Sequence, residues 1–351
     1  ERRPAGRTRK GSSAASDVYK GQPIDKAVET AEHLVEANLK GHDSHGVGMI
    51  PRYVSAAKNG FLDVHANAEL VKDKGAVLLV DGHQGFGQVV GRQATDMGLE
   101  RVKDTGIVCI GSRNNHHLGR IGTYAERCAE AGYVSVHFVN VVGHPPFVSP
   151  WGGRDKRMQT NPFCCAVPTD DDPIVLDMAT SAIALGKVRV AGMKGVPLPE
   201  GSLFDVQGSP TTDPGAIAAG GSLAPFGAHK GYGLALICEL LGGGLAGEWT
   251  MQDVAKQQDT TINHMLMFII DPDVFGGQDS FRREVMGMRD WLHSSDPAVG
   301  FDRVRTPGEP ERETMAERLE KGIPVDEQAW DTICTAASKA GISESEEKVY
   351  T

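Results

Sequence analysis

The sequence predicts an α/β protein whose central sheet is mixed rather than all-parallel. Its β-prone and helical segments do not alternate as they do in a chain of βαβ units. A glycine-rich segment also lacks the spacing of a dinucleotide-binding turn, because Gly85, Gly87 and Gly91 form GxGxxxG and not GxGxxG. With 351 residues, 40% of them hydrophobic, the chain can bury a large core in two lobes or one elaborated domain.

Composition argues against several classes of partner and location. The net charge is −10 and no basic stripe with interleaved aromatic residues occurs, so we expect no nucleic acid partner. No apolar run reaches the ~18 residues of a membrane-spanning helix, and no apolar segment follows the basic N-terminus as in a secretory signal. Six cysteines without a CxxC pair favour reduced thiols and a cytoplasmic location. A small anionic substrate would need local positive charge, for which the candidates are Arg52, Arg120, Lys187, Arg189 and Lys230.

Periodicity defines the expected elements in the first half of the chain. Residues 1–23 are basic, rich in serine, glycine and alanine, and aperiodic, so we expect a disordered or loosely attached arm. Apolar residues recur at helical spacing from Ile24 to Leu39. Further helices are expected at 54–60, which a glycine ends, at 89–105 and from about residue 121. Apolar or β-branched runs predict strands at 76–80, 107–111 and 133–142.

The second half is more irregular. His229 and Lys230 precede an almost wholly apolar segment, which we expect to form a buried helix. The run HMLMFII at 264–270 predicts a central strand. Residues 201–213 and 307–311 are expected to form turns. The other expected strands are 164–168 and 174–177, and the other expected helices are 178–191, 282–292, 313–321 and 326–340.

Polar residues stand side by side in the segment GHDSHGVGMIPRY, residues 41–53. His45 follows the hydroxyl of Ser44 and is a candidate proton carrier, because imidazole titrates near neutral pH. The same pattern would arise at a helix end that Asp43 or Ser44 caps, and the segment alone does not separate the two alternatives.

A second polar cluster, residues 114–117, is expected in a loop between strand 107–111 and the next helix. Such junctions attract phosphates and carboxylates, because the N–H groups at a helix N-terminus point toward them. Gly119 and Gly122 would allow close approach of the backbone, and Arg120 could reach a phosphate.

Other chemistries match the sequence less well. His42 and His45 with His116 or His117 could hold a metal ion, but HExxH spacing is missing, so we expect none. Ser44 lies outside any GxSxG motif, which argues against a serine nucleophile. Histidine with polar donors and glycine-edged turns favours hydride transfer between a carbonyl and a nicotinamide.

Six motifs in order carry a resemblance that spans about residues 24–345: GHDSHGVGMIPRY, NNHHLGRIGTYAE, TNPF, LDMATSAIALGK, HKGYGLAL and PGEPE. Together they resemble the type 2 malate/L-lactate dehydrogenase family, and within it the hydroxycarboxylate dehydrogenase B branch. The resemblance implies a non-Rossmann fold with a mixed, largely antiparallel sheet flanked by helices, and a homodimer. We expect a helical domain of residues 24–65 plus 280–351, and a cofactor- and substrate-binding α/β domain of residues 66–279.

The resemblance also implies roles for individual residues. His45 would be the proton carrier, held by Ser44, and His117 the second acid/base residue. Substrate contacts are expected from Thr160 and Asn161, and from Arg52. Contacts to NAD or NADP are expected from His45, Gly119, Arg120, Ile121, Leu176, Asp177, Met178, Lys230, Pro307, Gly308 and Glu309.

The sequence departs from the family pattern at two places. Many members carry a substrate-binding arginine four residues after the SHG histidine, where this chain has Met49, and Arg52 is the nearest arginine. A methionine cannot bind a carboxylate, so we expect bulkier or more apolar 2-oxo acids. Residues 182–185 are apolar where some members place an acidic relay residue, so a relay would come from elsewhere, with Asp43 as a candidate.

Function is therefore expected to be NAD(P)-dependent interconversion of 2-oxo acids and 2-hydroxy acids. One alternative on the same fold is a reductase of cyclic imino acids. Another is a relative that binds the cofactor but has lost the chemistry, which Met49 motivates.

Overall fold

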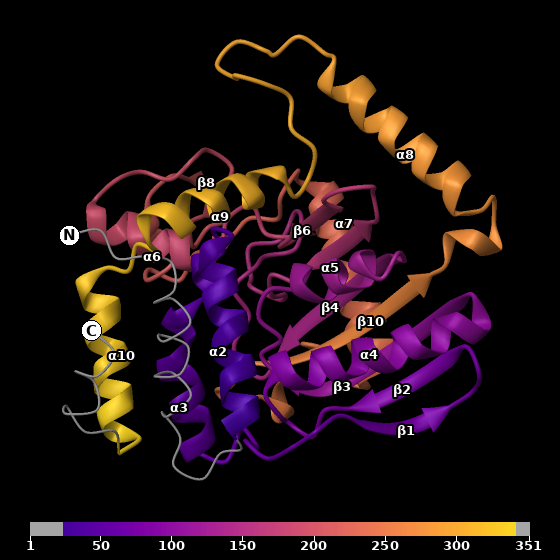
Figure 1. Cartoon of the computed structure of the whole chain (residues 1–351). Helices are drawn as coiled ribbons and strands as arrows, with labels where there is room; N and C mark the ends of the chain where they lie inside the picture. The colour runs from indigo at the N-terminus through magenta and orange to yellow at the C-terminus, as the bar shows by residue number, and fades with distance from the viewer. Residues whose placement is uncertain (1–23, 342–351) are drawn as a thin grey trace.

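The computed structural model describes residues 24–341, so the arm that we expected at residues 1–23 lies outside the described residues (Figure 1). The chain builds a seven-stranded sheet in the order β1-β2-β3-β10-β4-β5-β6. Only β2 and β3 are parallel; the other neighbouring pairs are antiparallel. The prediction of a mixed, largely antiparallel sheet is confirmed. The strands are β1 Glu69–Asp73, β2 Val77–Asp81, β3 Ile107–His116, β4 Val134–Val142, β5 Phe163–Val167, β6 Ile174–Met178 and β10 Ile262–Ile270.

The central strand is β10, as its sequence predicted. It pairs with β3 on one side and β4 on the other, and most of its residues are buried. A strand covered on both faces has no polar face to expose, which explains its continuous apolar run. Its Met265, Met267 and Ile269 belong to the largest apolar core.

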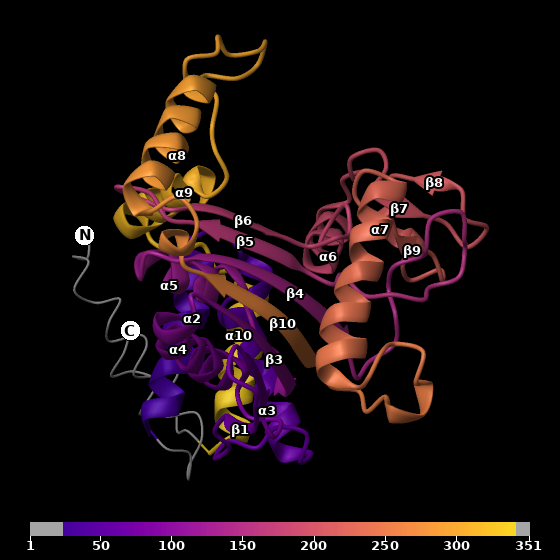
Figure 2. The same cartoon turned by 90° about the vertical axis from the view of Figure 1, so that its right-hand side faces the viewer.

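Helices cover both faces of this sheet (Figure 2). On one face lie α4, Gly87–Thr105, and α5, Gly122–Glu130. On the other lies the π-helical stretch η5, Glu239–Gly247, which continues α7, His229–Cys238. Its glycines permit close packing: a Cβ at Gly242 would lie 2.9 Å from backbone atoms of β4, and one at Gly247 would lie 2.2 Å from the His264 ring.

Both ends of the described chain meet in a helical layer beside the sheet. It comprises α2, Ile24–Leu39, α3, Ile50–Lys58, α9, Glu309–Lys321, and α10, Glu327–Lys339. Leu34, Tyr53 and Ile333 share its apolar core. The helix α8, Gln278–His293, which we expected in the same unit, has no buried residue, and its Arg289 pairs with Asp171 of the β5–β6 turn at 2.6 Å.

A smaller lobe lies beside the main sheet, and the chain forms most of it between β6 and β10 (Figure 2). It contains α6, Leu185–Lys194, and a three-stranded sheet of β7, Leu203–Phe204, β8, Pro210–Thr211, and β9, Ser222–Leu223. Its own core includes Val148, Leu203 and Leu223. We expected only turns at 201–213, because two-residue strands leave no periodic signal.

Three local predictions are wrong. The polar cluster 114–116 is the end of β3 and not a loop, because β3 continues its pairing with β10 as far as His116. The helix expected from residue 178 begins at Leu185, because Thr180 instead donates its hydroxyl to the backbone oxygen of Thr160 at 3.0 Å. The apolar segment after Lys230 is not buried on all sides, since Ile237 is 44% and Leu245 is 66% exposed.

All six cysteines are free thiols. None of the helices within residues 24–341 is both long and apolar enough to cross a membrane.

Candidate active site

Two histidines from distant segments lie ring against ring. The ring centroids of His45 and His117 are 5.4 Å apart and their planes differ by 16°. His45 ends a short 3₁₀ turn, Asp43–His45, directly after α2, and His117 follows the last residue of β3. The structure therefore brings together the two motifs that the sequence singled out.

Each histidine is held through its Nδ1 atom. The hydroxyl of Ser44 lies 2.9 Å from Nδ1 of His45, and the hydroxyl of Tyr53 lies 2.7 Å from Nδ1 of His117. Gln88 donates its amide N–H to the Tyr53 hydroxyl at 2.8 Å. In the described part of the chain, Nε2 of both rings lacks a hydrogen bond and is available to a reacting group.

Burial determines the protonation of both rings. It lowers the pKa of His45 to about 4, an effect that the negative charge of Asp177 partly opposes. It also lowers the pKa of His117 well below 6.5, and the neighbouring His45 and His116 lower it further. Both imidazoles are therefore neutral at pH 7.

Sequence reasoning did not identify Tyr53 or Gln88. Burial raises the pKa of Tyr53, which keeps its hydroxyl protonated as a donor. Tyr53 stands at the end of the opening motif, eight residues after His45, but its direction depends on how α3 packs against α4. No local signal in the sequence points to Gln88.

The turn that carries His45 is tied to two helices. Asp43 accepts from both Nη atoms of Arg318 on α9, at 2.6 and 3.0 Å, and from Asn38 on α2 at 2.7 Å. Asn38 also accepts from the backbone N–H of Val47 at 2.8 Å. No side chain caps the turn, so the capping alternative is wrong. Within residues 24–341, the carboxylate of Asp43 bonds Arg318 and Asn38 and makes no hydrogen bond to His45.

The guanidinium of Arg120 is not free to bind a phosphate. It is buried and forms two bonds to Glu126, at 2.8 and 2.9 Å. The adjacent Gly119 has φ +74°, and a Cβ there would lie 2.5 Å from Nε2 of His33. The absent Cβ of Gly119 thus leaves room for the His33 ring, whose Nε2 also accepts from the backbone N–H of Arg120 at 3.0 Å, and the Arg120 side chain stabilises the fold.

Three of the expected cofactor segments meet around β6. The backbone N–H of Val175 donates to Pro307 at 3.0 Å, which joins β6 to the start of α9. The carboxylate of Asp177 accepts from the N–H of Gly122, beside Ile121, at 2.7 Å. Gly308 has φ +96° and stands at the N-terminus of α9, where N–H groups favour anions.

These segments suit a nicotinamide dinucleotide. The N–H groups at the start of α9, where Gly308 stands, favour an anion such as a phosphate, and Leu176 is 36% exposed and offers apolar surface to a planar ring. Lys230 is exposed in the first turn of α7, in the other lobe, and its side chain lacks a hydrogen bond or ion pair within residues 24–341.

The two residues expected on the substrate side behave differently. Asn161 is fully buried, and its amide donates to Glu239 at 2.7 Å and to the backbone of Ala235 at 3.2 Å. It therefore has no amide N–H left for a substrate. The hydroxyl of the half-buried Thr160 makes no hydrogen bond in the described region and is available.

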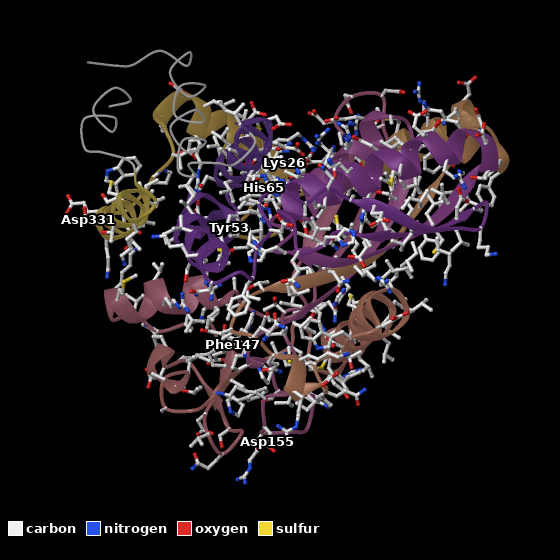
Figure 3. The ribbon with its side chains drawn as sticks, turned by 90° about the horizontal axis from the view of Figure 1, so that it is seen from below. Lys26, Tyr53, His65, Phe147, Asp155 and Asp331 are labelled. Atoms are coloured by element: carbon white, nitrogen blue, oxygen red, sulfur yellow. The ribbon has the colours of Figure 1, made fainter. Side chains whose placement is uncertain are left out.

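The guanidinium of Arg52 has no hydrogen bond or ion pair among the described residues. Partial burial lowers its pKa, and the positive charge of Arg189 on α6 lowers it further. Met49 instead packs in the helical core, 8% exposed. The first turn of α6 faces Ser44, because a Cβ at Gly186 would lie 3.4 Å from the Ser44 Cβ. In Figure 3, Tyr53 marks the α3 side and Phe147 the side of the smaller lobe.

Within residues 24–341, no three side chains of histidine, cysteine, aspartate or glutamate are placed to hold a metal ion. His42, one of the residues considered for this role, instead faces Glu311 of α9 at 3.5 Å.

The chain resembles known proteins over most of its length. A family model described as malate/L-lactate dehydrogenase matches residues 18–334. The chain is 46% identical to hydroxycarboxylate dehydrogenase B of Escherichia coli (strain K12) over 329 residues, which cover 92% of this chain and 90% of that protein.

Solved structures of related enzymes have the same fold as this chain. Sulfolactate dehydrogenase from Methanocaldococcus jannaschii superposes with a TM-score of 0.86 at 32% identity, covering 98% of each chain. Delta1-piperideine-2-carboxylate reductase from Pseudomonas syringae superposes with a TM-score of 0.79 at 30% identity, covering 96% of this chain and 99% of that chain. The chain belongs to the malate/L-lactate dehydrogenase family.

Proposed function

We propose that this protein interconverts 2-oxo acids and 2-hydroxy acids by hydride transfer with NAD or NADP, and that His45 and His117 handle the proton. The observation that carries the proposal is the stacked pair, in which Ser44 and Tyr53 hold both Nδ1 atoms and leave both Nε2 atoms available. Two neighbouring neutral imidazoles with unbonded Nε2 atoms suit a reaction that moves one proton to or from a carbonyl oxygen.

The two histidines have different roles in proton transfer. Because Gln88 donates to the Tyr53 hydroxyl, that hydroxyl directs its own hydrogen to Nδ1 of His117. His117 then carries its hydrogen on Nε2 and binds the substrate oxygen as a donor. The ring of His45 can exchange its proton, because the Ser44 hydroxyl at its Nδ1 can rotate to donate or accept. A bound nicotinamide supplies or accepts the hydride.

The substrate carboxylate would be bound by Arg52, which stands three residues after the buried Met49 on the same helix end. Its unpaired guanidinium is suited to a carboxylate, and the Thr160 hydroxyl would add a neutral donor. Because Met49 contributes only apolar surface in the core, we propose 2-oxo acids with bulky or apolar side chains over small dicarboxylates.

A screen of NADH and NADPH consumption with phenylpyruvate, oxaloacetate and a cyclic imino acid tests the proposal. We expect phenylpyruvate to give the highest kcat/KM, and the screen identifies the preferred cofactor. His45→Gln should lower turnover by on the order of 10²–10⁴-fold. Turnover within about threefold of wild type would refute the role of His45.

The same screen covers the alternatives. The likeness to delta1-piperideine-2-carboxylate reductase favours a cyclic imine as the second candidate substrate, and faster turnover of the imine than of any 2-oxo acid would support it. Cofactor binding without turnover across the panel would indicate a catalytically silent relative.

We also propose a homodimer. On α7 and η5, apolar side chains face solvent in the single chain: Leu236 38%, Ile237 44%, Leu240 49% and Leu245 66% exposed. A contiguous apolar patch of this kind is typical of a subunit interface. Leu240→Glu should convert the dimer to a monomer in analytical ultracentrifugation. The free thiols of all six cysteines support a cytoplasmic location.

A further inference from the structure

Glu239 is a buried carboxylate that the reaction as described does not use. It begins η5 and is 6% exposed. One oxygen accepts from the Asn161 amide at 2.7 Å, and the other from the backbone N–H of Met251 at 2.7 Å and the Asn140 amide at 3.4 Å. No cation pairs with it within residues 24–341. Burial of a carboxylate without a cation costs free energy, which the hydrogen bonds from these amide groups offset.

One branch of this network reaches the substrate side. Asn161 has φ +21°, a conformation that costs a non-glycine residue on the order of 1–3 kcal/mol unless its surroundings hold it. Its side chain is held at both ends, because its oxygen accepts from the N–H of Val141 at 3.2 Å while its amide binds Glu239. The preceding residue is Thr160, whose hydroxyl is available to a substrate.

The other branch reaches the histidines. The backbone oxygen of Asn140 accepts from the Asn263 amide at 3.0 Å. The Asn263 side-chain oxygen then accepts from the backbone N–H of Leu118 at 2.9 Å. Leu118 directly follows His117, so a continuous series of buried hydrogen bonds connects Glu239 to the residue beside the proton-handling ring.

We propose that Glu239 is a positioning residue: its carboxylate fixes Thr160 and, through Asn140 and Asn263, the segment that carries His117. The inference rests on the proposed function, because it concerns the placement of the substrate between these two segments. A carboxylate is required because three donors converge on its two oxygens. A glutamine offers one oxygen and one donor group, so it would set two donors against each other.

The test compares Glu239→Gln with the exchange Glu239→Gln/Asn161→Asp. The exchange reverses donor and acceptor across the 2.7 Å contact and thereby restores the hydrogen bond. We expect Glu239→Gln to raise KM for the 2-oxo acid about tenfold or more, with the cofactor Kd within twofold of wild type, and the exchange to recover part of the KM. Glu248→Gln, on a side chain 76% exposed at the end of η5, is the matched control.

The outcomes separate the two claims. If wild type reduces no substrate of the panel, the proposed function fails. If wild type is active and Glu239→Gln lowers only the melting temperature while KM stays within twofold, the positioning role is overturned. Should Glu239→Gln not fold, Glu239→Asp retracts the carboxylate by one methylene and should raise KM in the same way; an unchanged KM would again overturn the inference.

Discussion

The hydroxyl of Tyr53 lies between Gln88 and His117, 2.8 Å from the amide of one and 2.7 Å from Nδ1 of the other. This arrangement favours the tautomer of His117 that carries its hydrogen on Nε2. It also explains why a tyrosine on α3 matters to a histidine at the end of β3.

Removal of that hydroxyl should therefore impair turnover. We expect Tyr53→Phe to lower kcat about 10–100-fold, the range found when a partner that orients a functional histidine is lost. The cofactor Kd should change little. Tyr133→Phe is the control, because Tyr133 precedes β4 at the end away from Asn140 and its hydroxyl has no hydrogen bond within residues 24–341. Steady-state kinetics with the best substrate of the panel would measure the effect, and equal losses in both variants would contradict it.

The buried imidazoles predict the pH dependence. Because the pKa of His45 is lowered to about 4, the ring is neutral throughout the physiological range. Oxidation of a 2-hydroxy acid needs a neutral base, so its kcat/KM should be constant between about pH 5.5 and 7.5. Reduction needs the protonated ring, so its kcat/KM should fall about tenfold per pH unit over the same range. A transition near pH 6.5 in either direction would contradict the lowered pKa, and His45→Gln should abolish the dependence in reduction.

Part of this candidate site could be predicted from the sequence, because its two histidines stand in short local motifs. His45 with Ser44, and His117, stand in short motifs whose polar character is visible without a fold. The central strand β10 was predicted for the same reason, since burial on both faces leaves a continuous apolar run.

The contacts that occupy several of these side chains form only on folding and could not be predicted from the sequence. Arg120 was expected to contact the cofactor, but its guanidinium binds Glu126, six residues further along the chain. Asn161 was expected to contact substrate, but Glu239, 78 residues away, occupies its amide. Tyr53 and Gln88 acquire their role only where α3 meets α4. The π-helical stretch η5 has an apolar face that a single chain leaves exposed, so its composition alone wrongly predicted burial.

Arg52 should determine affinity for the substrate carboxylate. A charge-assisted hydrogen bond contributes about 1.5–3 kcal/mol, so Arg52→Gln should raise KM for a 2-oxo acid by roughly 10–150-fold. A 2-oxo amide, which lacks the carboxylate charge, should lose much less. Lys58→Gln removes a positive charge at the end of the same helix and should leave KM unchanged. Equal losses with acid and amide would show that Arg52 does not bind the carboxylate.

The fully buried His137 predicts acid sensitivity of the fold itself. Burial lowers its pKa to about 3, and its Nε2 lies 3.0 Å from the hydroxyl of Ser135. The unfolded chain binds a proton at this residue below about pH 6.5, whereas the folded chain does not until about pH 3. The stability is thus complete above pH 6.5 and declines as the pH falls.

Between pH 6.5 and 5 this one residue should remove about 2 kcal/mol from the free energy of unfolding. His137→Gln retains a donor for Ser135 and cannot be protonated. Between pH 6.5 and 5, wild type should therefore lose about 2 kcal/mol more of its free energy of unfolding than the variant loses. Urea unfolding at pH 7.5, 6 and 5 measures it. The exposed His65 provides the control, since His65→Gln should leave the pH dependence unchanged. Parallel curves for wild type and His137→Gln would mean that the imidazole is protonated in the folded core, with its Nδ1 bonded to a group such as a buried water.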